Sequence, residues 1–200
     1  DGNKGPNTGG MGVAAPNFYY TEEIAEECMR KIFIPTVNAM NAEGRKFKGC
    51  LYFGLMLTKD GPKVIEYNCR FGDPEAEAVL PLLESDLFEI MLAVREEKLS
   101  EIEIKFKNAA SCCVVLASGG YPGSYLTGYE IDFGESEKIP GVEIFHAGTK
   151  REGNKYFTSG GRVLAVNAVA ENFALAREKA YEAVKLINFE GARYRTDIGG

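Results

Sequence analysis

The sequence has no tryptophan, one histidine and no apolar run near the ~18 residues that a membrane-spanning helix needs. It therefore gives no indication of a membrane protein. Basic residues do not dominate either: the net charge is −6, whereas non-specific nucleic-acid binding needs a basic surface. A local group of Lys and Arg side chains can still bind a small anionic substrate on an acidic protein.

Paired cysteine motifs are also absent. The five cysteines are an odd number, and none has the CxxC spacing of a zinc site. The adjacent Cys112 and Cys113 would point to opposite faces of a strand. Buried free thiols in a reducing cytoplasm are the simplest interpretation.

The first residues lack the basic and apolar regions of a signal peptide. There is no initial Met, and the sequence opens inside a Gly-rich loop. We therefore expect the chain to be a fragment of a longer polypeptide. With 45% hydrophobic and 26% charged residues, the chain can bury a sizeable core.

The order of patterns predicts an α+β fold with a boundary near residue 110, giving regions 1–109 and 110–200. In the first region, Thr21 is a plausible N-cap of a helix that continues through Pro35. Two strand-like runs, 49–58 and 63–68, then flank an Asp-Gly turn that is typical of a hairpin. Helical patterning follows to about residue 97. The second region reads as short strands and a closing helix at 171–187, the strands being 111–117, 130–133, 142–147, 155–158 and 162–168.

The most informative segment is the second hairpin run. Because side chains alternate along a strand, Glu66, Asn68 and Arg70 would share one face. The residues between them, Ile65 and Tyr67, would face the core with Cys69. A carboxylate and an amide oxygen suit a hard cation such as Mg²⁺, and a guanidinium beside them can hold phosphate or carboxylate oxygens. The alternative is an edge strand with a solvated polar face.

The continuation of this strand carries a resemblance. The string Ile65-Glu66-Tyr67-Asn68-Cys69-Arg70-Phe71-Gly72-Asp73-Pro74-Glu75 resembles the metal-binding signature of the phosphoribosylamine–glycine ligases. Further segments are similar to the same family in order along the whole chain: 1–12, 49–56, 112–122, 158–163 and 195–199. The resemblance implies the C-terminal part of an ATP-grasp domain at 1–109, the metal-binding lobe, followed by a C-terminal β-rich domain at 110–200.

The resemblance also implies an activity. Members of the family use ATP to join glycine to 5-phosphoribosylamine through glycyl phosphate, giving glycinamide ribonucleotide in purine biosynthesis. Glu66 and Asn68 match the ligands of Mg²⁺ or Mn²⁺. Arg70 is expected to hold the transferred phosphoryl group or the glycine carboxylate. Asp73 is expected to receive the substrate amine, and Glu75 to orient Arg70 or the loop.

Two other segments are expected to bind substrate. The residues Pro6, Asn7, Thr8, Gly9 and Gly10 would shape the substrate side of the cleft and offer backbone N–H groups to anions. A purely structural turn explains these glycines nearly as well.

Arg162 is the candidate for binding the ribose 5-phosphate, with Lys155 as its helper. A structural ion pair is the alternative role for Arg162.

The sequence departs from the family pattern next to the site. Ala76 and Glu77 stand where the family usually has Thr and Gln. The lobe that clamps ATP and the amino-terminal domain are expected to be missing, so residues 1–200 should be inactive alone. Two other functions stay open: another ATP-grasp ligase or carboxylase, and a non-catalytic interaction module that retains the fold.

Overall fold

The computed structural model describes residues 1–200, which form two compact units. The sheet unit consists of Asp1–Ala15, Asp73–Leu82 and Lys107–Gly200. The hairpin unit consists of Pro16–Gly72 and Leu83–Phe106. Neither unit is one continuous segment, because the chain passes from one to the other four times.

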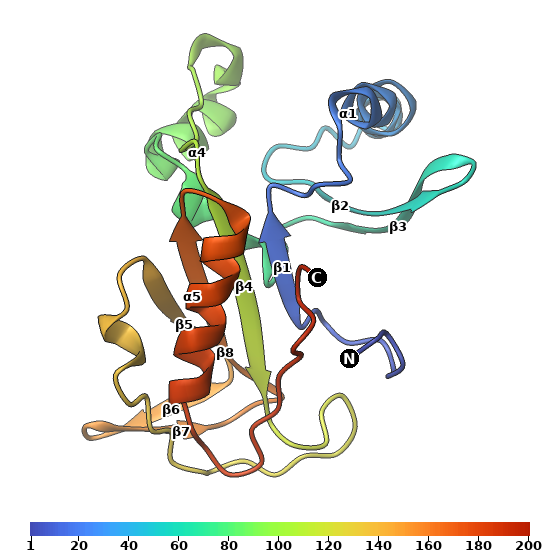
Figure 1. Ribbon diagram of the computed structural model, residues 1–200. Helices are drawn as coiled ribbons and strands as arrows, with labels where there is room; N and C mark the ends of the chain where they lie inside the picture. Colours follow the sequence, from blue (N-terminus) through green and yellow to red (C-terminus); the bar gives the residue numbers. More distant parts are fainter. The chain divides into compact units, whose positions relative to one another are not determined.

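The sheet unit is built on a four-stranded antiparallel sheet in the order β1-β4-β8-β5 (Figure 1). Its strands are β1 (Gly12–Ala15), β4 (Ala110–Ala117), β8 (Arg162–Ala170) and β5 (Val142–His146). A separate two-stranded sheet pairs β6 (Thr149–Glu152) with β7 (Lys155–Thr158). No strand was predicted at β1, which pairs with β4 over its whole length.

Helices cover both faces of this sheet. On one face, Cys112, Val114 and Leu116 pack in a buried cluster with residues of α5 (Phe173–Leu186), which lies across the sheet in Figure 1. On the other face, Cys113 and Val115 pack with residues of α3 (Glu75–Val79) and the 3₁₀ turn η2 (Leu80–Leu82). Every residue of β4 is therefore buried, and the two adjacent cysteines face opposite ways as predicted.

Two details of the predicted strands differ. The segment 130–133 is not a strand, because Ile131 N–H donates to Tyr156 O and Asp132 N–H to Asn188 O. These partners lie far apart in the sequence, so they form isolated bridges rather than a ladder. A short 3₁₀ turn, η4 (Ser136–Lys138), follows, and β6 was not predicted.

The hairpin unit opens with a continuous helical segment of α1 (Glu22–Cys28), a π-helical turn η1 (Met29–Phe33) and α2 (Ile34–Ala42). Thr21 Oγ1 caps α1 by accepting from Ile24 N–H at 3.4 Å, as predicted. The helix continues through Pro35, also as predicted. Since Pro35 has no N–H to donate to the preceding turn, the widened π turn before it is a reasonable consequence.

The predicted hairpin is present as β2 (Tyr52–Thr58) and β3 (Gly61–Asn68). Phe53 of β2 contacts Phe33 of the π turn and Tyr67 of β3, with ring centroids 4.4 and 5.3 Å away. The prediction that Ile65, Tyr67 and Cys69 pack on a core is wrong, because all three are exposed, Ile65 by 62% and Tyr67 by 50%. The unit is completed by α4 (Leu87–Glu96) and the 3₁₀ turn η3 (Leu99–Glu101).

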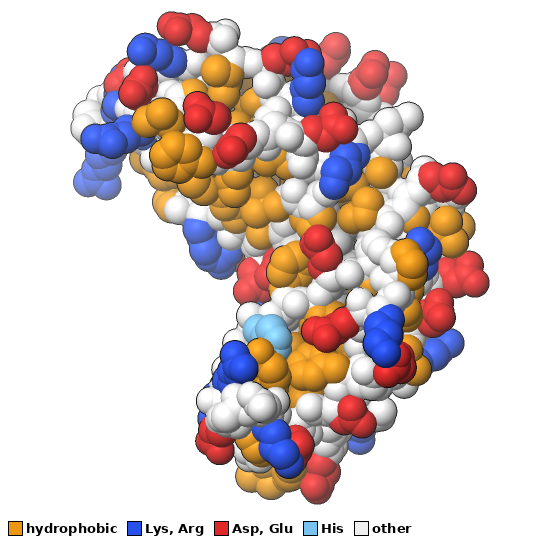
Figure 2. Space-filling model, turned by 90° about the vertical axis from the view of Figure 1, so that its left-hand side faces the viewer, with side chains coloured by type: hydrophobic (Ala, Val, Ile, Leu, Met, Phe, Trp, Pro, Cys, Tyr) orange, Lys and Arg blue, Asp and Glu red, His pale blue; other side chains and the backbone are white.

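All five cysteines are free; Cys28, Cys112 and Cys113 are buried, Cys50 is half-buried and Cys69 is exposed. None of the helices has the length and apolar character required to cross a bilayer. Figure 2 shows charged and hydrophobic side chains interspersed on the face that it presents.

The buried sheet makes a stability prediction possible. Leu164 of β8 is fully buried in the cluster under α5, so Leu164→Ala should leave a cavity and lower the free energy of unfolding by about 2–5 kcal/mol. The matched change Leu126→Ala, at a side chain 72% exposed, should change it by less than about 0.5 kcal/mol. Urea unfolding followed by far-UV circular dichroism measures both. Equal effects would contradict the assigned core.

Candidate functional site

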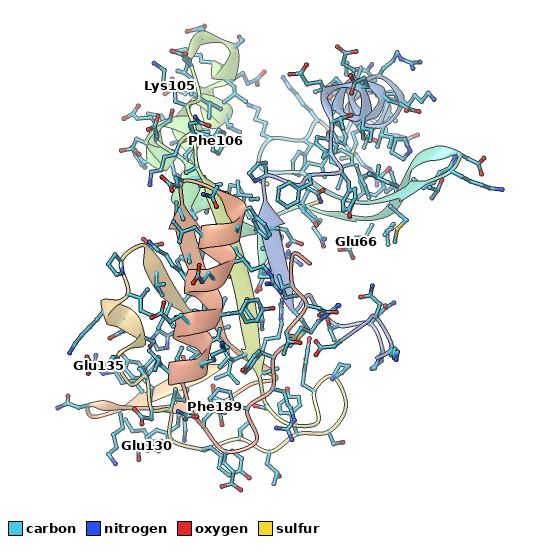
Figure 3. The ribbon with its side chains drawn as sticks, viewed as in Figure 1. Glu66, Lys105, Phe106, Glu130, Glu135 and Phe189 are labelled. Atoms are coloured by element: carbon cyan, nitrogen blue, oxygen red, sulfur yellow. The ribbon has the colours of Figure 1, made fainter.

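The predicted metal-binding residues lie at the end of β3 in the hairpin unit. Asn68 Nδ2 donates to Glu66 Oε1 at 3.1 Å, and Arg70 Nη2 donates to Asn68 Oδ1 at 3.4 Å. The three side chains therefore form a connected polar row, although Arg70 lies beyond the last residue of the strand. Figure 3 labels Glu66 on this hairpin.

A glycine on the neighbouring strand makes room for the carboxylate. Gly54 is the Cα partner of Glu66, and a Cβ added to Gly54 would lie 2.7 Å from Glu66 Cγ. Real Cβ atoms do not approach this closely, so any larger residue would displace the Glu66 side chain. The pairing register also shifts between Gly54 and Leu55, which places a bulge beside Glu66. Sequence reasoning missed Gly54, although a glycine inside a strand is itself a signal of close approach.

The row offers few oxygens. No group of three or more His, Cys, Asp or Glu side chains gathers as a complete metal site. Glu66 provides a carboxylate and Asn68 an amide oxygen. The carboxylate accepts from Asn68 Nδ2, and the amide oxygen accepts from Arg70. This set fits Mg²⁺ in the manner usual for nucleotide sites, where one or two protein ligands are completed by water and phosphate oxygens.

A second group of predicted residues meets in the sheet unit around Arg162, the first residue of β8. Its Nη1 donates to Gly9 O at 2.7 Å, to Asp73 O at 2.7 Å and, at 3.4 Å, to Gly10 O. The same nitrogen lies 3.0 Å from Asp73 Oδ1. The Arg162 side chain is 20% exposed, so these contacts are largely screened from water. One guanidinium thus joins two segments that are more than sixty residues apart in the sequence.

Tyr121 is a further member of this group. Its hydroxyl accepts from Gly9 N–H at 3.0 Å, and its ring lies against Gly161, where an added Cβ would be 2.3 Å from Tyr121 Cδ2. The segment around Tyr121 was noted as a resemblance, but no role was assigned to the side chain. Its contact with Gly9 spans 112 residues, so spacing along the chain gives no indication of it.

The rest of the N-terminal segment is fixed to the end of the chain. Thr196 N–H and Oγ1 both donate to the Asp1 carboxylate at 2.8 Å. Gly2 N–H donates to Asp197 Oδ2 at 2.7 Å, and Arg195 pairs with the same carboxylate. These donors hold the pKa of Asp197 well below its usual range, Arg195 being the largest cause.

The remaining predicted substrate residues are not gathered around Arg162. Pro6, Asn7 and Thr8 are exposed, and Thr8 Oγ1 accepts from Gly10 N–H at 3.2 Å. Lys155 begins β7, where it pairs with Glu130 at 2.8 Å; Figure 3 labels Glu130.

Acidic side chains follow Asp73 on α3. Glu75 is half-buried at the start of the helix. Burial raises the pKa of Glu77; the Asp73 and Glu75 carboxylates act in the same direction, against its backbone N–H and Arg162. Burial is also the main cause of the raised pKa of Cys113, and the charge of Glu77 adds to it.

The hairpin unit contains a cavity of about 550 Å³ with mainly apolar walls. Its lining includes Cys50, Phe71 and residues of α4, with Lys48 and Arg95 as the charged members. None of the predicted site residues lines it. The predicted residues therefore divide between the Glu66–Asn68–Arg70 row in one unit and the Gly9–Asp73–Arg162 group in the other.

Comparison with known families gives two matches along the chain. Residues 1–76 match the family model described as Phosphoribosylglycinamide synthetase, ATP-grasp (A) domain, and residues 111–200 match that of the Phosphoribosylglycinamide synthetase, C domain. The polar row and Gly9 lie in the first match, and Arg162 and Tyr121 lie in the second.

Relatives extend over the whole chain. The phosphoribosylamine–glycine ligase of Caldanaerobacter subterraneus is 47% identical over 195 residues, which are 98% of this chain and 46% of that protein. The trifunctional purine biosynthetic protein adenosine-3 of Gallus gallus is 48% identical over 200 residues, or 100% of this chain and 20% of that protein. The chain thus spans about half the length of the single-function relative and a fifth of the trifunctional one.

Solved structures agree with these family matches. The crystal structure of phosphoribosylamine–glycine ligase from Thermotoga maritima matches with a TM-score of 0.86 and 35% identity, covering 100% of this chain and 49% of that one. The biotin carboxylase domain of a Hydrogenobacter thermophilus 2-oxoglutarate carboxylase matches with a TM-score of 0.60 at 15% identity, which shows a shared fold alone. With two family models in sequence order and relatives along its full length, the chain belongs to the phosphoribosylglycinamide synthetase, or phosphoribosylamine–glycine ligase, family.

Proposed function

We propose that the polypeptide carrying this chain joins glycine to 5-phosphoribosylamine at the expense of ATP, giving glycinamide ribonucleotide, ADP and phosphate. Glycyl phosphate is the intermediate of this proposal, because a carboxylate is a poor acyl donor until it is phosphorylated. The observation that carries the proposal is the connected row of Glu66, Asn68 and Arg70 within the segment that matches the family.

Glu66 and Asn68 would hold Mg²⁺ or Mn²⁺. When bound, such an ion neutralises the charge on ATP phosphates and orients them. Gly54 supports this role by leaving space for the Glu66 carboxylate. Asn68 is kept in place from both sides, since its amide nitrogen donates to Glu66 and its oxygen accepts from Arg70.

Arg70 and Asp73 are the proposed catalytic residues. The Arg70 Nη1 donates to Phe71 O at 2.8 Å, which directs the planar guanidinium along the turn where it can hold phosphoryl or carboxylate oxygens. Asp73 is proposed to receive the amine of phosphoribosylamine and take up its proton. Glu75 is proposed to orient this loop.

The substrate phosphate is proposed to bind beside the Gly-rich loop of Pro6, Asn7, Thr8, Gly9 and Gly10. The polar contacts of Arg162 all use Nη1, which leaves Nη2 and Nε to hold an anion. Arg162 would thus both shape the loop, through Nη1, and bind the substrate phosphate, through Nη2 and Nε. Lys155 keeps its proposed role as a helper, although its ammonium group pairs with Glu130.

The proposed partners are small molecules and the rest of the same polypeptide. ATP, glycine and 5-phosphoribosylamine would bind with the help of an amino-terminal domain and an ATP-clamping lobe. Neither nucleic acid nor membrane is among the proposed partners. A cytoplasmic location is proposed because all five thiols are free.

The proposed activity can be tested by ADP release from the full-length polypeptide. Turnover should require both glycine and phosphoribosylamine, because each contributes one of the joined groups. Residues 1–200 alone should release no ADP in response to glycine. Turnover of the full-length protein that is indifferent to glycine would overturn the substrate assignment and favour another ATP-grasp reaction.

The metal role of the polar row predicts a graded effect. Glu66→Ala should lower glycine-dependent ADP release by on the order of 100-fold or more, because it removes the charged ligand. Gly54→Ala should weaken Mn²⁺ binding by about 10–100-fold, because its Cβ displaces the Glu66 side chain. Electron paramagnetic resonance of Mn²⁺ with ATP measures the binding.

The matched control for this series is Gly5→Ala, where nothing lies within 4 Å of the added Cβ. It should leave Mn²⁺ binding unchanged. If Glu66→Ala bound Mn²⁺–ATP as tightly as the unaltered protein, the metal assignment would be wrong.

The role of Arg162 predicts both a structural and a substrate effect. Arg162→Gln should lower the free energy of unfolding by roughly 2 kcal/mol, because charge-assisted bonds to largely screened carbonyls are lost. It should also raise the KM for phosphoribosylamine. Arg193→Gln is the control, since the exposed Arg193 side chain bonds only to the neighbouring Ala192 O. Unchanged stability and KM would contradict the assignment.

A further inference from the structure

Gly9 of the Gly-rich loop is bound through both of its main-chain polar groups. Its N–H donates to the Tyr121 hydroxyl at 3.0 Å, and its carbonyl accepts from Arg162 Nη1 at 2.7 Å. A Cβ added to Gly9 would lie 3.1 Å from Arg162 Cζ and 3.2 Å from Nη2, so the guanidinium also lies against this residue. A phenol and a guanidinium therefore meet at one point of the loop.

The position of the Tyr121 side chain is fixed by the fold. Its ring lies against Gly161, where an added Cβ would be 2.3 Å from Tyr121 Cδ2. The Tyr121 N–H donates to Ser118 O at 3.1 Å, and Ser118 N–H donates to Gly161 O at 2.8 Å. Since Gly161 directly precedes Arg162, one turn supports both side chains. The phenol is thus held in place before any ligand binds, which lowers the cost of binding.

The hydroxyl proton of Tyr121 is unused. A phenol can accept and donate at the same time, and here the oxygen accepts from Gly9 N–H while the O–H donates to no protein group. Accepting one hydrogen bond polarises the O–H and makes it a stronger donor. Gly9 is exposed, so water could satisfy its N–H, and the stability of the loop alone does not require this contact. Tyr121 therefore presents an oriented, free donor beside Arg162.

The charges of the group favour a further donor for an anion. Arg162 Nη1 lies 3.0 Å from Asp73 Oδ1, so the two side chains together carry no net charge. A phosphate monoester carries a charge of about −1.5 to −2 near neutral pH. Arg162 Nη2 and Nε can donate to it, but the Asp73 carboxylate opposes its approach. A neutral hydroxyl adds a hydrogen bond without adding charge, and tyrosine hydroxyls commonly bind phosphate oxygens.

We propose that Tyr121 is a substrate-binding residue, whose hydroxyl donates to a phosphate oxygen of the ribose 5-phosphate held by Nη2 and Nε of Arg162. The ligand class of this site is a sugar phosphate monoester. The inference rests on the proposed function, since it assigns a further residue to the phosphate site of that reaction. In the absence of substrate, the same hydroxyl keeps Gly9 in place.

The binding test uses the full-length polypeptide with ribose 5-phosphate and, as the phosphate-free probe, ribose. Saturation-transfer NMR measures both, because it detects weak ligands. Tyr121→Phe should weaken the binding of ribose 5-phosphate by about 10-fold or more, since a hydrogen bond to a charged group is lost. Ribose should bind the variant and the unaltered protein alike. A merely structural role of Tyr121 would instead change both ligands equally.

The matched control is Tyr125→Phe. The Tyr125 ring also lies against Gly161, with Cε1 3.1 Å from an added Cβ, but its hydroxyl forms no hydrogen bond. This variant should leave the binding of both probes unchanged. In steady-state kinetics, Tyr121→Phe should raise the KM for phosphoribosylamine by about 10-fold and leave the KM values for ATP and glycine unchanged.

The outcomes separate this inference from the proposed function. If the unaltered protein lacks glycine-dependent turnover, the proposed function fails, while the ribose 5-phosphate titration still decides the role of Tyr121. The inference would be overturned by equal affinity of Tyr121→Phe and the unaltered protein for ribose 5-phosphate, by an equal loss for ribose, or by an equal loss in Tyr125→Phe. Failure of the unaltered protein to bind ribose 5-phosphate would overturn it as well.

Discussion

The guanidinium of Arg162 is the contact on which the arrangement of the sheet unit depends. Through one nitrogen it binds the main chain of the Gly-rich loop and of the turn at Asp73, and it does so from the first residue of the central strand β8. Main-chain carbonyls in a turn have no ladder to pair with, so a largely screened cation satisfies several at once. Residues matched to the ATP-grasp domain are thereby built into the same unit as those matched to the C domain.

This arrangement explains why the two compact units do not follow the family domains. Residues 12–15 form β1 and cover the edge of β4, whose N–H and C=O groups would otherwise be unpaired. The hydrogen bonds from Thr196 and Gly2 then fix the first residues against the end of the chain. The predicted boundary near residue 110 remains a prediction. In the structure, the N-terminal segment and α3 share a core with β4 and β8.

The hairpin unit, in contrast to the sheet unit, forms its polar row without contacts between distant segments of the chain. Phe33 of the π turn contacts Phe53 of the hairpin, which in turn contacts Tyr67, and large apolar side chains such as Ile65 stay exposed. A two-stranded hairpin buries little surface, and independent stability usually needs further strands or a packed helix. The polar row of Glu66, Asn68 and Arg70 is nevertheless formed, because its members are neighbours along one strand and need no distant residue to bring them together.

The sequence by itself determined what depends on neighbours in the chain. The helix cap at Thr21, the Asp-Gly hairpin, the opposite faces of Cys112 and Cys113, the polar row and the family were all predictable, because periodicity and short motifs act locally. Only the tertiary structure decided that β1 joins the sheet and that Tyr121 binds the Gly9 loop. Those contacts join residues roughly ninety or more positions apart in the chain, and their free energy comes from burial and hydrogen bonding that no local pattern encodes.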